Sequence, residues 1–282
     1  KKNIVILIQP KVGYLDSVKT NYAIPLALLS VASMIHKDYE VIIFDQRIHS
    51  DWEKKIDRLL EKNPVCIGLT SMTGEQLYYA LEISKRIKSK GNYPVIWGGI
   101  HPTLDSHNVL KNKNIDIVVR GEGEETFKEL INHLEKNKNI KSIKGISFKS
   151  KEGKIISNPE RGFIDLNKLP EIPYNLIDLE KYTGKYKGRR SLHVQLSRGC
   201  PFACTYCYNS IFNKSRWRTL TAENAFKIIS TLYHKHNIRY FDFLDDNLFV
   251  NLDRMEKIAD DIIKNKMDII WKGTLEIPSS KR

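Results

Sequence analysis

Residues 196–209 read LSRGCPFACTYCYN and place three cysteines, Cys200, Cys204 and Cys207, in a C-x3-C-x2-C spacing. This stretch follows an apolar run over residues 192–196, which predicts a loop directly after a strand. Thiolates are soft ligands of the kind that hold iron–sulfur clusters. Three thiolates on one loop can bind three irons of a 4Fe–4S cluster, which leaves the fourth iron open for chemistry. The motif therefore predicts a reactive iron–sulfur site.

A zinc knuckle without its fourth ligand and three unrelated buried thiols are the alternatives for this motif. Structural zinc sites almost always have four ligands. The nearest histidine, His193, lies on the preceding strand rather than on the loop. The spacing therefore favours the cluster.

The motif resembles that of the radical S-adenosylmethionine (radical SAM) enzymes. The cysteine spacing, Tyr206 before the third cysteine and the preceding Ser197-Arg198-Gly199 carry the resemblance, which extends over residues 191–277. It implies that the three cysteines ligate the cluster and that the methionine part of SAM binds the open iron, where SAM is cleaved reductively.

The same resemblance implies further contacts to SAM. Tyr206 is expected to pack on the adenine, with a core tyrosine as the alternative. Asp245 and Asp246 stand where many members carry Gly-Gly-Glu, and one of them is expected to bind the SAM amino group, since a carboxylate pairs well with an ammonium. Glu276 is expected to reach the ribose or the sulfonium, with an exposed turn as the alternative.

The composition indicates a cytoplasmic protein. The chain has 282 residues, 41% of them hydrophobic, which is enough for two domain cores. No run of 18 apolar residues predicts a spanning helix, and the N-terminus lacks the apolar segment of a signal peptide. Three of the four cysteines belong to the motif, so a reducing compartment is expected, with no membrane partner. The fourth, Cys66, is expected to be a buried core thiol.

The net charge of +13 suggests nucleic acid as a possible partner. The excess is spread evenly, with 23 basic and 17 acidic residues in 1–150 and 23 and 16 in 151–282. Such a spread is typical of a solvated, lysine-rich surface, so no nucleic acid partner is expected. One local basic run is a candidate for docking something acidic: Lys181, Lys185, Lys187, Arg189 and Arg190.

The first 136 residues alternate buried strands with amphipathic helices. Strands are expected at residues 4–8, 41–44, 65–69, 93–97 and 115–119. Five strand–helix units in a row predict a parallel sheet with helices on both faces. The expected order is 2-1-3-4-5, an α/β, flavodoxin-like (Rossmann-type) fold whose ligands bind beyond the carboxyl ends of the strands.

Two loops at that edge are rich in glycine. They contain Gly98, Gly99, His101, Pro102, Gly121 and Gly123. Glycine lets a large ligand approach the backbone closely, although ordinary tight turns have the same composition.

With the radical SAM motif in view, these loops resemble those of the cobalamin-binding domains that often precede such a core, over residues 3–134. The resemblance implies a corrinoid lying across the loops. Four residues are expected near its lower face: Thr70, Ser71, Met72 and Thr73. The D-x-H-x-x-G signature of a lower axial histidine is missing, and His49 and His101 have the wrong spacing. We therefore expect cobalt without a histidine ligand.

The expected organisation is a Rossmann-like cobalamin-binding domain over residues 1–140, a hairpin and packed connector over 141–190, and the N-terminal part of a radical SAM βα barrel over 191–282. The last part has room for about half of a barrel. Since a barrel cannot close its hydrogen bonding with half its strands, an incomplete barrel is expected.

These features predict a cobalamin-dependent radical SAM enzyme that uses a 4Fe–4S cluster, SAM and cobalamin to methylate an unactivated carbon. The expected partners are a small-molecule or peptide substrate and a flavodoxin- or ferredoxin-type reductant. One alternative is a cyclisation or rearrangement enzyme with the same cofactors. The other is a corrinoid carrier or sensor without catalysis.

The three-cysteine loop predicts the metal content. Anaerobically reconstituted protein is expected to hold about four irons and four sulfides per chain. Cys204→Ala is expected to abolish the cluster, because two thiolates do not retain a cubane. Iron and sulfide analysis measures both, and zinc as the only metal of protein purified without oxygen would contradict the prediction.

Overall fold

The computed structural model describes residues 2–18, 22–150 and 152–276. Residues 277–282 of the expected barrel segment lie outside this range. The chain divides into two compact units. Unit 1 comprises Lys1–Lys19, Pro25–Ile164 and Leu169–Leu179, and unit 2 comprises Thr20–Ile24, Asp165–Lys168 and Glu180–Arg282. The domain boundaries at residues 140 and 190 remain predictions.

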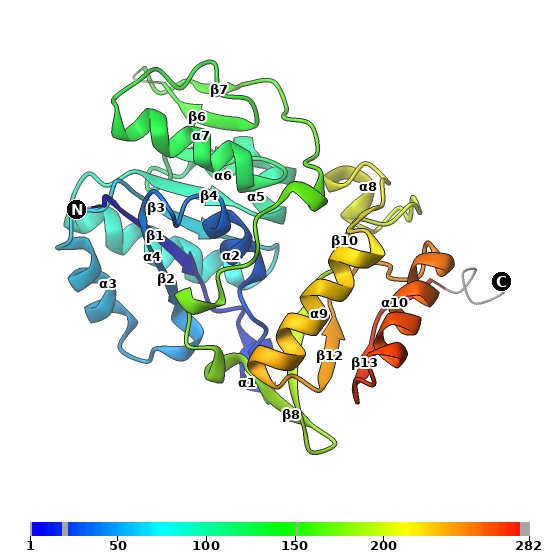
Figure 1. The fold of residues 1–282 in the computed structure, drawn as a ribbon. Helices are drawn as coiled ribbons and strands as arrows, with labels where there is room; N and C mark the ends of the chain where they lie inside the picture. Colours follow the sequence, from blue (N-terminus) through cyan, green and yellow to red (C-terminus); the bar gives the residue numbers. More distant parts are fainter. Residues whose placement is uncertain (1, 19–21, 151, 277–282) are drawn as a thin grey trace. The chain divides into compact units, whose positions relative to one another are not determined.

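Unit 1 is built on a sheet with the order β2-β1-β3-β4-β5-β6-β7 (Figure 1). Its strands are β1 (Ile4–Gln9), β2 (Glu40–Asp45), β3 (Cys66–Thr70), β4 (Val95–Gly98), β5 (Ile117–Val119), β6 (Ile146–Lys149) and β7 (Ile155–Ser157). The first five strands are parallel, which confirms the predicted order 2-1-3-4-5 and the flavodoxin-like fold. The predicted hairpin extends this sheet, because β6 pairs antiparallel with β5 and β7 with β6.

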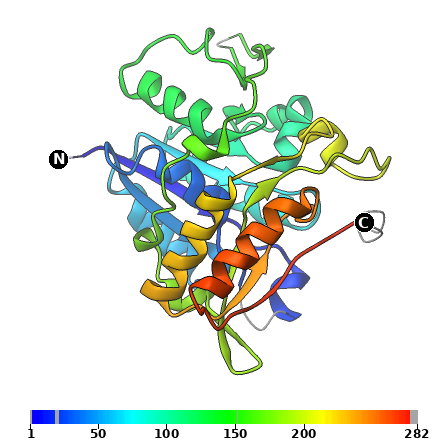
Figure 2. The same ribbon diagram turned by 45° about the vertical axis from the view of Figure 1, so that its right-hand side comes forward.

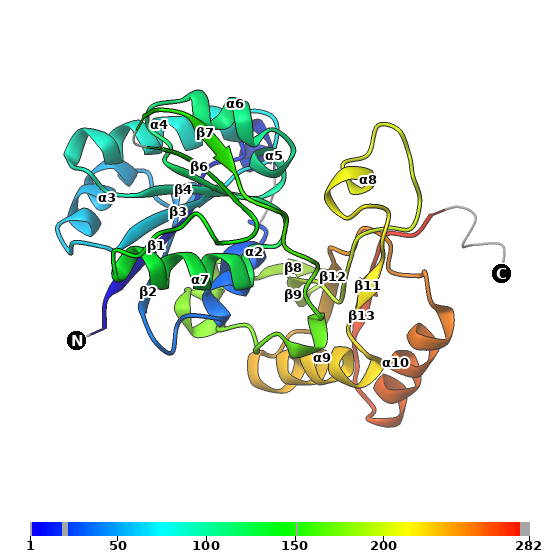
Figure 3. The same cartoon turned by 90° about the horizontal axis from the view of Figure 1, so that it is seen from above.

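Strand β1 explains why helices cover both faces of this sheet. Its side chains alternate, so Ile4, Ile6 and Ile8 enter one apolar core while Val5 and Leu7 enter another. Figure 3 shows the helices of the two cores on opposite sides of the strands. Cys66 is fully buried in the second core, and burial raises the pKa of its thiol, which confirms an inert core cysteine.

The helices of unit 1 follow this division. Residues of α3 (Trp52–Leu60), α4 (Gln76–Lys90) and α6 (Ser106–Lys111) pack in the first core, and residues of α2 (Leu26–Ser33) and α7 (Gly123–Glu135) pack in the second. The loops after β1, β2 and β4 contain the short elements α1 (Tyr14–Val18), η1 (Gln46–Ile48) and α5 (Ile100–Leu104). The short turn η3 (Tyr174–Leu176) also belongs to unit 1, whereas η2 (Leu166–Lys168) belongs to unit 2.

Unit 2 contains a sheet with the order β13-β12-β9-β8. Its strands are β8 (Gly184–Tyr186), β9 (Arg189–Val194), β12 (Tyr240–Phe243) and β13 (Ile270–Lys272). Strands β9, β12 and β13 are parallel, and β8 forms an antiparallel hairpin with β9. The described part of unit 2 contains no closed barrel, in agreement with the expected partial one.

Two helices connect the parallel strands of unit 2. Helices α9 (Ala222–His236) and α10 (Leu252–Lys264) run side by side (Figure 2). The predicted N-cap of α9 is confirmed, since the Thr221 hydroxyl accepts a hydrogen bond from the Asn224 amide at 3.2 Å. The remaining elements are η4 (Leu179–Tyr182), β10 (Ser197–Arg198), α8 (Asn209–Phe212) and β11 (Arg218–Thr219).

The strand expected over residues 192–196 has different bounds, because β9 begins at Arg189 and ends at Val194. The chain leaves the sheet there, since the Leu196 amide donates to the Asp245 carboxylate. Ser197 then pairs with Thr219 in a separate two-stranded ribbon of β10 and β11. The cysteine loop therefore follows this ribbon and not the sheet strand itself. None of the described helices is long and apolar enough to cross a membrane.

Candidate cofactor sites

The cysteine loop of unit 2 is held at both ends by the carboxylate of Asp246. One oxygen, Oδ2, accepts a hydrogen bond from the Gly199 amide at 3.0 Å, and Oδ1 accepts one from the Tyr208 hydroxyl at 2.7 Å. Gly199 directly precedes Cys200, and Tyr208 directly follows Cys207. One side chain after β12 therefore ties together the start and the end of the segment that carries the three thiols.

Tyr208 is a functional residue that the sequence pattern did not reveal. Its ring packs edge-on against Phe212, with centroids 6.1 Å apart. Burial and the Asp246 carboxylate both raise the pKa of the phenol, so the hydroxyl stays protonated and donates. The available signal was the second aromatic of the motif, directly after Cys207.

Tyr206, the aromatic that the pattern did favour, is 91% exposed. The alternative of a core tyrosine is therefore wrong. Among the described residues of unit 2 the ring is therefore not part of a core, and it is available to a ligand. Its contact with the SAM adenine stays a prediction.

The donor set of the loop fits an iron–sulfur cluster. All three cysteines are half-buried free thiols, the form that binds iron. The Cys207 amide donates to the Cys204 carbonyl at 3.0 Å, so these two lie on one turn, and Asn247 Nδ2 lies 4.0 Å from Cys200 Sγ.

The thiols are nevertheless not gathered into a preformed metal site. Over the residues that the structure describes, no group of three or more His, Cys, Asp or Glu lies close enough to hold a metal ion. Hydrogen bonds fix the two ends of the loop, and metal binding commonly completes the geometry of such sites because it is coupled to folding. The ligand assignment stays a prediction.

Asp245, the other carboxylate of the predicted pair, supports the backbone where the chain leaves β9. It is 2% exposed and accepts hydrogen bonds from the Leu196 amide, 3.2 Å from each oxygen, and from the Ser197 hydroxyl. Burial raises the pKa of this carboxyl from its ordinary value of 3.8 to about 6, while the hydrogen bonds and the Arg254 charge oppose the rise. Asp245 and Asp246 therefore both have structural partners, and a SAM contact by either stays a prediction.

The carboxylate of Glu276 has one oxygen whose hydrogen-bonding capacity is unused among the described residues. Its Oε2 is shielded from solvent and has no hydrogen-bond partner within residues 2–276 as described. A buried carboxylate oxygen without a partner is costly, and an ammonium, a sulfonium or a hydroxyl placed against it would remove that cost. Because β9, β12 and β13 are parallel, Glu276 lies beyond the same strand ends as the cysteine loop and Asp246.

In unit 1 the predicted loop residues form one hydrogen-bonded edge. The Ser71 amide donates to the Gly98 carbonyl at 2.9 Å, and the His101 amide donates to the Ser71 carbonyl at 3.2 Å. The Thr103 hydroxyl then donates to the Gly99 carbonyl at 2.7 Å and accepts from the Gly121 amide at 2.9 Å. The loops after β3, β4 and β5 are thereby joined at the carboxyl ends of the strands.

The glycines of these loops differ in what surrounds them. A Cβ on Gly98 would meet only the Val119 carbonyl oxygen, at 3.8 Å, so its free face is open. Gly99 has a φ of +99° and a closed surrounding, because a Cβ there would lie 2.8 Å from the Ser71 carbonyl oxygen. A Cβ on Gly123 would lie 3.3 Å from Val31, so packing of α7 on α2 accounts for this glycine.

The other predicted corrinoid residues also differ in how far they are buried. Thr70 is half-buried, Ser71 and Pro102 are buried, and Thr73 and Met72 are exposed, Met72 by 41%. The His101 ring nitrogen Nδ1 lies 3.0 Å from the Thr73 hydroxyl. His49 stacks on Phe44, with ring centroids 5.0 Å apart. Cobalt without a histidine ligand stays a prediction.

Comparison with known proteins identifies both halves of the chain. Residues 15–131 match the B12 binding domain family, and residues 186–276 match the 4Fe–4S single cluster domain family. The predicted resemblance and the cobalamin and 4Fe–4S cofactors are thereby confirmed at the level of the domains.

Individual relatives agree with these matches. The chain is 32% identical to the uncharacterized methyltransferase PH0819 of Pyrococcus horikoshii, over 97% of this chain and 60% of that protein. It is 30% identical to the anaerobic magnesium-protoporphyrin IX monomethyl ester cyclase of a Synechocystis species, over 89% of this chain and 50% of that protein. The chain thus spans between half and two thirds of the length of these relatives.

Two solved structures share the fold. The cobalamin-dependent S-adenosylmethionine radical enzyme OxsB, with aqua-cobalamin and S-adenosylmethionine bound, superposes with a TM-score of 0.80 at 22% identity, over 96% of this chain and 38% of OxsB. The radical S-adenosylmethionine methyltransferase TsrM of Kitasatospora setae, with cobalamin and a 4Fe–4S cluster bound, superposes with a TM-score of 0.75 at 16% identity. The match covers 94% of this chain and 52% of TsrM.

The buried carboxyl of Asp245 predicts a pH dependence of stability. Its raised pKa means that the folded state holds the proton up to about pH 6, whereas the unfolded state releases it near 3.8. Its contribution to the free energy of unfolding is therefore full below about pH 4 and is lost as the pH rises through 6, by up to about 3 kcal/mol. Urea unfolding of Asp245→Asn between pH 4 and 7 should lack this decline. Asp260→Asn, at an exposed position of α10, is the matched control, and equal pH slopes in all three proteins would contradict the prediction.

Proposed function

We propose that the chain, in which residues that match the B12 binding domain family precede residues that match the 4Fe–4S single cluster domain family, acts in a cobalamin-dependent radical SAM enzyme that methylates an unactivated carbon. The observation that carries the proposal is the donor set of unit 2. Three half-buried free thiols in C-x3-C-x2-C spacing lie on one loop within the matched 4Fe–4S domain. The methyltransferase among the relatives supports methyl transfer as the outcome.

The residues of unit 2 have distinct roles in this proposal. Cys200, Cys204 and Cys207 would hold the cluster, which when bound would supply the electron for cleavage of SAM, and cobalamin would carry the methyl group. Asp246 and Tyr208 keep the ends of the cysteine loop together. Tyr206 offers an exposed ring to the adenine. Glu276 offers to the ribose or the sulfonium the oxygen Oε2, which has no hydrogen-bond partner in the described part of the chain.

Unit 1 offers the corrinoid a broad backbone surface. The joined loops after β3, β4 and β5 lie at the carboxyl ends of parallel strands, where ligands of such sheets bind. Gly98 and Gly121 have free space on the side where a Cβ would stand. Met72 and Thr73 are exposed in the loop after β3. We assign the corrinoid to this edge.

A cyclase is the second candidate, because a relative at 30% identity is an anaerobic magnesium-protoporphyrin IX monomethyl ester cyclase. A ring-forming reaction uses the same cofactors and differs in the fate of the substrate radical. In either case a small molecule is the proposed substrate, and a flavodoxin- or ferredoxin-type protein is the proposed source of electrons.

The function is tested with reconstituted full-length protein under reducing conditions. Incubation with SAM is expected to release 5′-deoxyadenosine, measured by mass spectrometry, and Cys204→Ala is expected to release none. With SAM labelled in its methyl group, transfer of the label to a small molecule of the cell extract supports methylation. Release of 5′-deoxyadenosine with an unlabelled cyclic product supports the cyclase. Absence of SAM cleavage by protein with a full cluster would overturn both.

The corrinoid edge is tested at Gly98. Gly98→Val adds a branched side chain on an open face without a backbone penalty, so it should weaken cob(II)alamin binding by at least about tenfold, which absorbance titration measures. Gly162→Val is the matched control, since a Cβ there also meets nothing within 4 Å and the residue lies outside these loops. Gly99→Val is a poor test, because it would disturb the Ser71 loop directly. Equal affinity of the Gly98 variant and the native protein would place the corrinoid elsewhere.

A further inference from the structure

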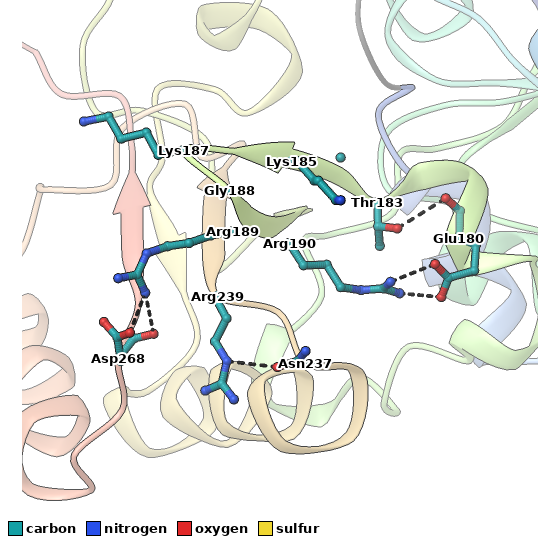
Figure 4. Close-up of a pocket in the computed structure, with 11 residues that line it drawn as sticks. Glu180, Thr183, Lys185, Lys187, Gly188, Arg189, Arg190, Asn237, Arg239 and Asp268 are labelled. Atoms are coloured by element: carbon teal, nitrogen blue, oxygen red, sulfur yellow. Dashed lines mark hydrogen bonds and ion pairs between the residues drawn. The ribbon is translucent and has the colours of Figure 1, made fainter.

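A basic cavity in unit 2 has no role in the function proposed above. It has a volume of about 780 Å³ (Figure 4). Its basic residues are Lys185, Lys187, Arg189, Arg190 and Arg239, and its acidic ones are Glu180 and Asp268. The four basic residues between 185 and 190 belong to the local run singled out in the sequence.

The cavity lies at the opposite end of the sheet from the cysteine loop. Arg189 and Arg190 begin β9, Arg239 directly precedes β12, and Asp268 lies two residues before β13. Since these three strands are parallel, the cavity is formed at their amino ends. The cysteine loop, Asp246 and Glu276 follow the carboxyl ends. The cavity is therefore separate from the candidate SAM site.

The carboxylates of the cavity neutralise only two of its five cations. Both guanidinium nitrogens of Arg190 contact Glu180, at 2.7 and 2.5 Å, and the Arg189 guanidinium lies 2.8 Å from the Asp268 carboxylate. Figure 4 shows these two ion pairs on the two sides of the cavity. Lys185, Lys187 and Arg239 form no ion pair with any carboxylate in the described part of the chain. The lining thus has an excess of three positive charges.

Two of these basic residues face each other across the hairpin of β8 and β9. Lys185 stands directly opposite Arg190 in the antiparallel ladder of β8 and β9, and like charges at opposed positions repel. The Arg239 guanidinium is held by neutral groups, over the Tyr233 ring at 3.6 Å from its centroid and with Nε donating to Asn237 Oδ1 at 3.0 Å. It is therefore positioned without an ion pair of its own among the described residues, although its charge also acts on Asp268. An anion in the cavity would offset the excess positive charge.

We propose that this cavity binds a phosphorylated small molecule that carries a diphosphate. Its volume is in the range of small-molecule sites, roughly 300–1,000 Å³. Arginine and lysine are the usual ligands of phosphate oxygens. An excess of three positive charges matches the charge of a diphosphate near neutral pH. Lys185 and Arg239 provide the principal contacts, and Lys187 adds charge at the hairpin turn.

Binding is tested by calorimetry on the full chain, with inorganic pyrophosphate and ADP as the two probes. Affinity for pyrophosphate should fall as salt is raised. Lys185→Gln/Lys187→Gln should weaken it at least about tenfold. Lys264→Gln, which removes an exposed lysine at the end of α10, is the matched control and should not change it. Both substituted lysines lie on an exposed hairpin, so circular dichroism should show that the double variant remains folded.

The two probes show which part of the ligand the cavity recognises. Equal affinity for both means that the diphosphate alone is bound, whereas tighter ADP binding means that the cavity also contacts the organic part. Absence of binding by either probe at low salt would overturn the proposal. So would a loss of affinity that is equal in the double variant and in the Lys264 control. Because the readout is binding and not SAM cleavage, its failure is distinguishable from a failure of the proposed function.

Discussion

Two adjacent carboxylates at the end of β12 organise unit 2. Asp245 accepts the Leu196 amide and the Ser197 hydroxyl, which turns the chain out of the sheet after β9. Asp246 accepts the Gly199 amide and the Tyr208 hydroxyl, which closes the cysteine loop. If either pair of contacts were absent, the segment between β9 and α8 would have lost its attachment to the neighbouring strand. The position of the three thiols therefore depends on a strand that follows them by about forty residues.

Burial of the Asp245 carboxyl in this arrangement is energetically unfavourable. Asp245 is nearly fully buried, and its raised pKa shows that burial outweighs the hydrogen bonds and the Arg254 charge. Arg254 is itself buried and donates to the carbonyls of Leu220 and Leu196, so it stabilises both sides of the same turn. A buried polar network of this kind contributes less to stability than an apolar core of equal volume, but it holds one backbone geometry.

The direction of the parallel strands explains where the candidate cofactor sites and the basic cavity lie in each unit. In unit 1, all the loops joined by Ser71, Thr103 and Gly121 follow carboxyl ends of strands. In unit 2, the cysteine loop and Glu276 follow carboxyl ends, and the basic cavity is formed at amino ends. A single sheet therefore presents two chemically different edges. One carries thiols and carboxylates suited to a metal cluster and a cationic cofactor, and the other carries cations suited to a phosphate.

The sequence by itself determined the two folds, because each depends on local patterns. Continuous apolar runs and amphipathic helices predicted the order 2-1-3-4-5, and the cysteine spacing predicted the iron–sulfur domain, since ligand types and spacings are local properties. The tertiary structure alone decided the roles of Tyr208, Asp245 and Asp246, and it alone showed that Gly98 is open while Gly99 is closed. It also brought Arg239 to a cavity with Lys185, more than fifty residues away along the chain. Burial and long-range hydrogen bonds depend on which side chains of distant segments meet in three dimensions, and a linear pattern does not contain that information.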